Sequence, residues 1–520
     1  MDTCLIQKPS TKKIYIRLIE APCDKKKTNP TNSLPSCITM GLNTYVKDLL
    51  HEIEHISGYS EEQINLFYDG TVLSSSKIPI FELLLMSNSV DGILKENEMS
   101  ITYQIMDQID ESIPFISLHG CSYVPPEFQE ALTACRIGFT QGLHPELALD
   151  GSGGTYFLRD RYRKKRLCFK PFDEEPYEVN NPRGFEGTGG CVGFRQGIHS
   201  GEGYKREIAA YLLDRSGFFR VPPTLPARIF HPSFSFLNDN PSPKLGSLQM
   251  FVDSRDIAGN WGPSKFSIQE VQKICLLDIY ILNTDRNDAN ILLTDDDYSG
   301  HFSFIPVDHG YSLPDRPEIS EYSWCWLDWP QVKQPWTPEC QEYIRNINVD
   351  NDSYMLYTNL GIRKICLIYM RISGILLQLS LEYNLSPYQV ACIYIRRGVG
   401  DEEKSRLDLI LEQTVAVARD LYIQTKNKNR AVLYSSTSHM KKENDLFLSE
   451  RQEIKRSKTS ISLDKMNSSV YISDFQYNTK KKLLLEEITN NKEMRHIFFD
   501  NLKGFLHTLL YNIAKKEGTI

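Results

Sequence analysis

The chain has 520 residues, of which 41% are apolar, 24% charged and 11% aromatic, a composition typical of a folded globular protein. Its 59 basic and 66 acidic residues leave a formal net charge of −7, which argues against a chain built to coat nucleic acid. The 12 cysteines are scattered and form no CxxC pair. Zinc-ribbon spacing is therefore absent, and reduced thiols are favoured over disulfides.

Residues 13–105 are predicted to form a small α+β unit. Apolar and polar residues alternate over residues 14–18, as in a half-buried strand. Between Val46 and Ile56 the apolar residues recur at spacings of three and four, which predicts an amphipathic helix. Asp69-Gly70 is typical of a two-residue turn between strands.

The rest of the chain changes composition several times. Residues 106–140 are predicted to be a connector, with a helix from Glu127 to Ile137 after a pair of prolines. Strands, glycine-rich turns and long helices follow over residues 141–423 and are typical of a two-lobed enzyme. Residues 424–475 are rich in Lys, Ser, Thr and Asn, which predicts a flexible tail. Helical spacing returns in residues 476–520.

No segment is predicted to direct secretion or to cross a membrane. The first residues lack the basic and apolar regions of a signal peptide. The most apolar long stretch, Cys366 to Leu381, is interrupted by Arg371 and falls short of the roughly 20 residues that a membrane helix needs. This stretch is predicted to be a buried helix, and the sequence favours a cytoplasmic protein whose membrane contact, if any, is peripheral.

A glycine-rich cluster is the first candidate for phosphate binding. Glycines allow backbone N–H groups to approach phosphate oxygens without a clash at Cβ, although such clusters also occur as plain turns. The motif GxxxxGK[ST] is absent, which excludes a P-loop of the usual form. The cluster consists of Gly151, Ser152, Gly153, Gly154 and Thr155.

A lysine and a glutamate further along the chain are a second candidate for phosphate binding. Lys170 lies in a short apolar strand and Glu207 lies on a predicted helix. Kinases use a Lys–Glu pair of this kind to hold the phosphates of ATP. Taken alone, these two residues also fit two unrelated surface charges.

The region around Asp285 carries the strongest signal. Asp285 and Asn290 are followed by an apolar strand, which is the D-x-x-x-x-N layout of a kinase catalytic loop. In that chemistry a carboxylate orients the attacking hydroxyl and accepts its proton, and an amide oxygen holds a metal ion beside the phosphates. A second strand ends at Asp308-His309-Gly310, as the metal-binding aspartate of kinases requires. A calcium loop is excluded because Ala289 stands where a ligand is needed.

In this order the motifs resemble the phosphatidylinositol 3-/4-kinase superfamily, in particular the type II and plant-gamma phosphatidylinositol 4-kinases with ubiquitin-like domains. The resemblance covers roughly residues 125–420, and residues 44–49 and 63–70 are similar to ubiquitin and its relatives. It implies an α+β protein: a bilobal protein-kinase-like catalytic domain preceded by a β-grasp ubiquitin-like domain. Another β-grasp or a simple cap is the alternative for residues 13–105. The segments that carry the resemblance are Lys170–Pro176, Asn180–Phe185, Arg206–Asp214, Val221–Thr224, Asn283–Arg286 and Trp324–Gln331.

The resemblance also implies roles for individual residues in transfer of the γ-phosphoryl group of ATP. Lys170 would hold the ATP phosphates and Glu207 would orient Lys170. Asp285 would act as the catalytic base, while Asn290 and Asp308 would bind magnesium or manganese. The glycine-rich cluster would cover the nucleotide. Adenine would meet the hinge residues, whose members are Gln249, Met250, Phe251 and Val252.

The substrate expected from the resemblance is phosphatidylinositol at a membrane surface. A serine/threonine protein kinase is the first alternative, because the stretch after Gly310 is mostly acidic whereas phosphate groups are usually bound by Lys or Arg. A catalytically silent scaffold, acting through a ubiquitin-pathway partner of residues 13–105, is the second alternative. Asn287 stands where many relatives have a histidine, so a histidine does not move the proton there. No nucleic-acid partner is expected.

Overall fold

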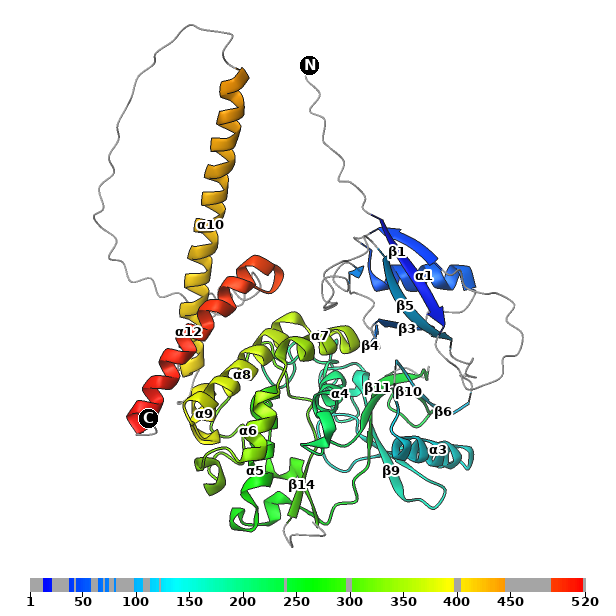
Figure 1. Ribbon diagram of the computed structural model, residues 1–520. Helices are drawn as coiled ribbons and strands as arrows, with labels where there is room; N and C mark the ends of the chain where they lie inside the picture. Colours follow the sequence, from blue (N-terminus) through cyan, green and yellow to red (C-terminus); the bar gives the residue numbers. More distant parts are fainter. Residues whose placement is uncertain are drawn as a thin grey trace. The chain divides into compact units, whose positions relative to one another are not determined.

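A computed structural model provides the structure of the chain (Figure 1). The chain divides into two compact units between Cys392 and Ile393. The residues that the structure describes are 13–20, 37–41, 44–57, 64–68, 71–73, 79–80, 98–105, 113–120, 123–237, 241–295, 302–396, 404–444 and 488–517.

The amino-terminal sheet has the strand arrangement of a β-grasp. Its order is β2-β1-β5-β3-β4, with β1 parallel to β5 and antiparallel to β2. Helix α1 packs Val46, Leu49 and Ile53 into the same core as the strands. These elements are β1 (Lys13–Glu20), β2 (Cys37–Gly41), α1 (Val46–Ser57), β3 (Ile64–Tyr68), β4 (Thr71–Val72) and β5 (Glu98–Ile105).

The details of this unit follow the predicted pattern with one exception. Ile16 and Leu18 are buried while Tyr15 is exposed, as the alternation along β1 requires. Ile56 belongs to the predicted apolar face but remains 36% exposed, because the buried stripe runs through Val46, Leu49 and Ile53. The predicted turn at Asp69-Gly70 lies outside the described residues.

A six-stranded antiparallel sheet forms the amino-terminal lobe of the larger domain. Its order is β6-β10-β11-β9-β8-β7, and every neighbouring pair is antiparallel. Its elements are β6 (Phe115–Leu118), α3 (Pro126–Thr140), β7 (Glu146–Leu147), β8 (Tyr156–Arg159), β9 (Lys165–Pro171), α4 (Gly203–Leu213), β10 (Thr224–Phe230) and β11 (Lys244–Met250).

This lobe absorbs most of the segment predicted to be a connector. The helix expected from Glu127 is confirmed as α3, with Pro126 in its first turn. However, Ile116 of β6 and Phe128 of α3 are buried in one core with Phe169 of β9. The assignment of residues 106–140 as a connector is therefore wrong for β6 and α3, because their buried apolar side chains make both elements part of the lobe.

The carboxyl-terminal lobe combines a small sheet with a helical core. Helix α5 begins after Ser267, whose side chain accepts a hydrogen bond from the N–H of Glu270 at 3.2 Å, and ends at Leu282 in the left-handed conformation. The elements are β12 (Asp256–Ile257), α5 (Ile268–Ile281), β13 (Ile291–Asp295), β14 (Phe302–Pro306), α6 (Pro338–Arg345), α7 (Val349–Leu360), α8 (Lys364–Glu382) and α9 (Pro387–Tyr394). Short 3-10 turns are η2 (Phe172–Glu174), η3 (Arg215–Gly217), η4 (Ala258–Asn260), η5 (Pro263–Lys265), η6 (Asp288–Asn290) and η7 (Pro330–Lys333).

Helix α8 contains the most apolar stretch of the sequence. It packs against α5, α6 and α7 (Figure 1). Among the described helices it alone has the length and hydropathy of a membrane span, yet 72% of that apolar window is buried inside the protein. The prediction of a buried helix for this stretch is confirmed.

The second unit contains two long helices, α10 (Arg406–Asn444) and α12 (Lys492–Glu517), which contact each other. Helix α10 runs past residue 424, so the predicted start of the flexible tail falls inside a helix. Residues 445–475 of the predicted tail lie outside the described residues, and the predicted helical segment 476–520 contains α12.

Candidate active site

The glycine-rich cluster forms the turn between β7 and β8. The N–H of Ala148 donates to the carbonyl of Thr155 at 2.8 Å and closes the turn. Gly151 has a φ of +112°, and a Cβ on Gly154 would lie 2.1 Å from Oε2 of Glu174. Glycine is therefore required at both positions, by backbone conformation at one and by space at the other.

Lys170 and Glu207 meet as the sequence predicted. Lys170 projects from β9 and its Nζ lies 2.5 Å from Oε1 of Glu207 on α4 and 3.0 Å from Oδ1 of Asp308. Burial alone would lower the pKa of Lys170, but the carboxylates of Asp308 and Glu207 raise it above its usual value. The lysine thus keeps its positive charge in the cleft.

Glu207 is a buried carboxylate whose ionised form is held by its neighbours. Its side chain is 3% exposed, and its Oε2 accepts a hydrogen bond from the backbone N–H of His309 at 3.0 Å. Burial raises the pKa of Glu207, but the charge of Lys170 and the contacts of His309 lower it well below its usual value. One carboxylate therefore links β9, α4 and the segment that carries Asp308.

The loop that carries Asp285 and Asn290 is organised by a buried arginine, Arg286, to which the sequence assigned no role. Arg286 is fully buried and its Nε donates to the carboxylate of Asp278 on α5 at 3.0 Å. Its Nη1 donates to the carbonyls of Asn290 at 2.9 Å and Val307 at 2.7 Å. Arg286 thereby ties the loop to the residue before Asp308, and this role depends on partners that only the fold brings together.

Asp285 and Asn290 lie on this loop. The N–H of Asp285 donates to Oδ1 of Asn283 at 2.9 Å, and Nδ2 of Asn290 lies 3.5 Å from the carbonyl of Asp285. Burial raises the pKa of the Asp285 carboxyl. The positive charge of Arg195 lowers this pKa, and the negative charge of Asp308 raises it further. The negative charge of Asp308 therefore acts on the Asp285 carboxyl.

A cleft of about 130 Å³ contains many of the predicted residues. The glycine-rich cluster, Lys170, Glu207 and Asp308 line it, whereas Asp285, Asn290 and the four hinge residues are not among its lining residues. The lining residues are Gly151, Ser152, Gly153, Gly154, Thr155, Lys170, Glu175, Pro176, Gly193, Phe194, Ile198, His199, Ser200, Gly203, Tyr204, Glu207, Asp308, Gly310 and Tyr311.

The hinge residues lie at the end of β11, but two of their N–H groups are already used. The N–H of Met250 donates to the carbonyl of Pro223 at 2.8 Å, and the N–H of Phe251 donates to the carbonyl of Arg166 at 3.0 Å. The side chain of Gln249 donates to Thr224 at 2.8 Å. The expectation that this backbone supplies hydrogen bonds to adenine therefore cannot rest on the N–H groups of Met250 and Phe251, because sheet and turn pairing occupy them.

Two residues between β9 and α4, Glu175 and Arg195, make contacts in the site that the sequence did not predict. Glu175 lines the cleft and accepts hydrogen bonds from the N–H groups of Gly201 at 2.9 Å, Gly203 at 3.0 Å and Tyr204 at 2.9 Å. It thus fixes the start of the helix that carries Glu207. Arg195 from the same segment forms an ion pair with Asp285. The segment is irregular and has no periodic pattern that would have marked these residues.

The oxygen donors near the cleft fit a divalent cation held together with phosphates. The Asp308 side chain is 52% exposed, and the carboxylate of Asp308 and the amide of Asn290 are the hard oxygen donors that magnesium prefers. Across the part of the chain that the structure describes, no group of three or more His, Cys, Asp and Glu residues could hold a metal by itself. Magnesium sites completed by substrate phosphates need only one or two carboxylates, so the donor set fits.

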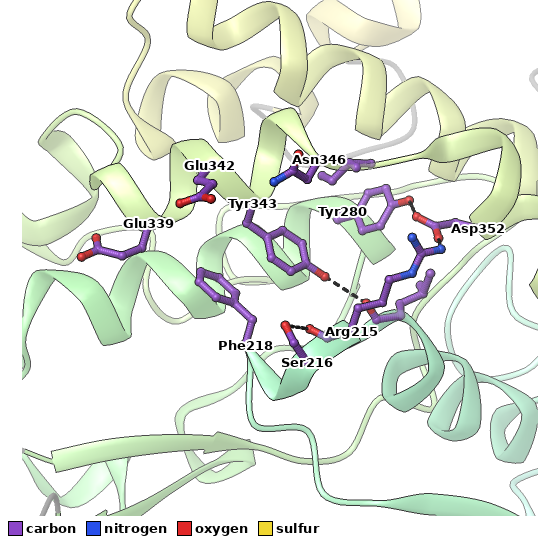
Figure 2. A pocket seen from close by; sticks show the side chains of 11 residues that line it. Arg215, Ser216, Phe218, Tyr280, Glu339, Glu342, Tyr343, Asn346 and Asp352 are labelled. Atoms are coloured by element: carbon purple, nitrogen blue, oxygen red, sulfur yellow. Dashed lines mark hydrogen bonds and ion pairs between the residues drawn. The ribbon is translucent and has the colours of Figure 1, made fainter. Parts of the chain in front are cut away.

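A larger cavity of about 410 Å³ lies elsewhere in the carboxyl-terminal lobe and at the end of α4 (Figure 2). Its buried carboxyl, Asp352, is paired with Arg215 and accepts a hydrogen bond from the hydroxyl of Tyr280 at 2.5 Å. The hydroxyl of Tyr343 donates to the carbonyl of Leu213 at 2.9 Å. None of the predicted site residues lines this cavity, so its greater volume does not make it the reaction site.

Comparison with known proteins gives matches over the same region. Residues 151–385 match the family described as phosphatidylinositol 3- and 4-kinase. The chain is 36% identical over 310 residues to phosphatidylinositol 4-kinase gamma 4 of Oryza sativa subsp. japonica, covering 57% of this chain and 53% of that protein. It is 33% identical to phosphatidylinositol 4-kinase gamma 2 of Arabidopsis thaliana, covering 61% and 60%.

A third relative extends the match further. Phosphatidylinositol 4-kinase gamma 8 of Arabidopsis thaliana is 34% identical over 374 residues, covering 69% of this chain and 66% of that protein. The chain thus spans between 53% and 66% of the length of these three relatives.

Among solved structures, the crystal structure of the Golgi casein kinase with Mn/ADP bound aligns with a TM-score of 0.30 at 14% identity, covering 44% of this chain and 70% of that chain.

Proposed function

The chain belongs to the phosphatidylinositol 3- and 4-kinase family, and from this premise we propose that it is a phosphatidylinositol 4-kinase. The reaction would transfer the γ-phosphoryl group of ATP to a hydroxyl of the inositol ring. The observation that carries the proposal is the position of Lys170 between Glu207 and Asp308 in a cleft closed by the glycine-rich cluster. This is the arrangement by which kinases hold nucleotide phosphates.

Each residue of the site has a part in the proposed reaction. Lys170 neutralises ATP phosphate oxygens, and Glu207 keeps the lysine charged and in place. Asp285 orients the inositol hydroxyl and accepts its proton as the hydroxyl oxygen attacks the γ-phosphorus. The glycine-rich cluster presents backbone N–H groups to the phosphates.

Asp308 and Asn290 would hold the divalent cation, which we propose to be magnesium. When bound, the cation neutralises charge that develops on the transferred group. The same donors also suit manganese, since both ions prefer carboxylate and carbonyl oxygens.

The acidic stretch after Gly310 does not oppose a lipid substrate as strongly as its composition indicated. Asp315 is paired with Arg363, and Glu318 lies 2.6 Å from Arg316. Much of the local negative charge is therefore neutralised inside the protein. Unphosphorylated phosphatidylinositol carries a single phosphodiester and needs few cations, so the lipid remains the favoured acceptor over a protein.

The proposal places the enzyme in the cytoplasm, in peripheral contact with a membrane that supplies the lipid. The β-grasp unit at residues 13–105 is proposed to be ubiquitin-like and to bind a ubiquitin-pathway partner. Its strand order β2-β1-β5-β3-β4 supports the proposal that the unit is ubiquitin-like.

The function is tested with the purified full chain, labelled ATP and two acceptors, phosphatidylinositol vesicles and a peptide library. Label in the lipid supports the proposal, and label in peptides alone replaces it with a protein kinase. Asp308→Ala should abolish metal-dependent transfer without loss of the far-UV circular dichroism spectrum. Cellular function that survives in a Lys170→Met variant, with neither acceptor labelled, would indicate a scaffold.

A further inference from the structure

The segment between β9 and α4 forms a short hairpin over the catalytic loop. Val192 and His199 make an antiparallel bridge. The N–H of Gly193 donates to the carbonyl of Ile198 at 2.8 Å, and the N–H of Ser200 donates to the carbonyl of Cys191 at 2.9 Å. Residues 191–200 are called the 191–200 hairpin below, and Arg195 lies at its tip.

We infer that Arg195 binds the phosphodiester of the acceptor lipid while the inositol hydroxyl reaches Asp285. The inference rests on the proposed function and deepens it. The guanidinium of Arg195 forms an ion pair with Oδ1 of Asp285, so it lies directly beside the proposed catalytic base. Its side chain is 49% exposed, which leaves N–H donors of the guanidinium open to a ligand.

The 191–200 hairpin is fixed in position by the carboxyl-terminal lobe. The carbonyl of Gly197 accepts hydrogen bonds from the N–H of Asp315 at 2.8 Å and from Arg363 at 3.2 Å. Gly197 has a φ of +79°, and a Cβ there would lie 2.7 Å from the carbonyl of Arg316. The hairpin is thus held by close backbone packing that only glycine allows.

The other end of the hairpin is tied to its own segment. Glu178 accepts a hydrogen bond from the hydroxyl of Ser200 at 2.5 Å and from the N–H of Gly190 at 3.1 Å. An arginine on a support of this kind is placed before the substrate arrives, which lowers the entropy lost on binding. The arrangement is that of a recognition group and not of a solvated surface charge.

The chemistry of Arg195 fits a phosphodiester. Guanidinium groups bind phosphate oxygens through paired N–H donors, with more geometric specificity than an ammonium group offers. The nucleotide already has Lys170 in the cleft, and Arg195 pairs with Asp285, on the acceptor side of the site. A cation at this position is therefore placed for the acceptor and not for ATP.

Apolar surface next to Arg195 points to a lipid and not to free phosphate. The ring of Phe194 meets those of Tyr177 at 4.8 Å and Phe185 at 4.9 Å, both edge to face. Phe185 and Phe194 are each 40% exposed and Val192 is 55% exposed. A phosphodiester that joins a sugar-like ring to acyl chains would meet the arginine and this apolar surface together.

The test compares Arg195→Ala and Arg195→Lys with the unmodified full chain, using Arg161→Ala as the matched control. Arg161 is an exposed arginine that contacts the neighbouring Tyr162. The Michaelis constants for phosphatidylinositol vesicles and for ATP are measured with kcat. Soluble glycerophosphoinositol, which keeps the phosphodiester and lacks the acyl chains, is the second acceptor.

We expect Arg195→Ala to raise KM for phosphatidylinositol about tenfold or more relative to KM for ATP, as loss of a charge-assisted hydrogen bond predicts. Arg195→Lys should raise KM for phosphatidylinositol by an intermediate factor, and Arg161→Ala should leave it unchanged. With glycerophosphoinositol as the acceptor, Arg195→Ala should raise KM by the same factor as with the lipid. A fall in kcat with an unchanged KM for lipid would overturn the inference, as would a rise seen with vesicles only. If the unmodified chain labels no lipid at all, the proposed function itself has failed.

Discussion

Glu207 accepts a hydrogen bond from the backbone N–H of His309 at 3.0 Å through one oxygen and from Nζ of Lys170 at 2.5 Å through the other. A single buried carboxylate therefore sets the position of the lysine and of the segment that begins at Asp308. Three elements of the cleft depend on one side chain, and its removal should disturb all of them together.

Glu207→Gln should lower kcat/KM for ATP by about tenfold to a hundredfold, because a charge-assisted contact with Lys170 is lost while the shape is kept. Steady-state kinetics against ATP concentration measure the effect. Glu186→Gln is the matched control, since Glu186 is exposed. Equal kinetics for the two variants would show that the Lys170–Glu207 pair does not support nucleotide binding.

Gly154→Ala should destabilise the protein by about 1–3 kcal/mol, the usual cost of overpacking. The new methyl group would meet Oε2 of Glu174, and that carboxyl cannot move freely because it is bound to Tyr156 at 2.6 Å and to Lys244 at 3.0 Å. Gly262→Ala is the control, since its nearest neighbour lies 4.0 Å away and its φ is −72°. Urea unfolding of both variants measures the difference, and equal midpoints would contradict the prediction.

Arg286→Met should destabilise the protein by about 3–5 kcal/mol, because it leaves the fully buried carboxylate of Asp278 without its ion-pair partner. Phosphotransfer should fall as well, since the loop and the segment before Asp308 lose their common hydrogen-bond donor. The control is Arg255→Met. The ion pair between Arg255 and Asp295 is exposed at both side chains, so its loss should change the free energy of unfolding little. Denaturant unfolding and activity assays would refute the prediction if the two variants behaved alike.

Glu202→Gln should remove a contribution to stability that depends on pH. Burial raises the pKa of Glu202, but Arg206 and Arg363 lower it to about 2, whereas the unfolded value is about 4.3. A depressed pKa stabilises the fold above the unfolded pKa, and this contribution disappears as pH falls toward the folded pKa. Near pH 7 the free energy of unfolding of the unmodified protein should therefore exceed that of the variant by about 2 kcal/mol.

The measurement is urea unfolding of both proteins from pH 7 downwards, as far as they remain folded. The difference between the two free energies of unfolding should be constant between pH 7 and pH 5 and should shrink below about pH 4. A difference that grew as the pH fell would reverse the sign of the linkage and would show that Glu202 is not held in its ionised form by the two arginines.

The sequence predicted those parts of the site that follow local patterns. The strand with Lys170, the helix with Glu207 and the turn at Asp308 each have a recognisable neighbourhood, and the structure brings Lys170, Glu207 and Asp308 together. Arg286 and Arg195 were not identified, because their partners are defined only by the folded chain. Arg195 lies 90 positions from Asp285, in a segment without helical or strand periodicity.

The fold shows the same limit. The β-grasp unit and α3 were predictable from alternation and helical spacing. The membership of β6 in the six-stranded sheet was not, because a strand of four residues gives no pattern of its own. The occupied N–H groups of Met250 and Phe251 were equally invisible, since hydrogen-bond partners on other strands are not encoded locally.

Arg363 binds Glu202 at 2.8 Å and also pairs with Asp315, and Glu202 immediately precedes α4. In many protein kinases the helix that carries the glutamate swings outward and so turns activity off. Here such a swing would break the ion pair between Arg363 and Glu202 as well as the hydrogen bond from Arg206 to the carbonyl of Ser312 at 2.6 Å. We therefore expect a kinase whose catalytic geometry is permanently assembled, so that control of turnover would fall on access to the acceptor.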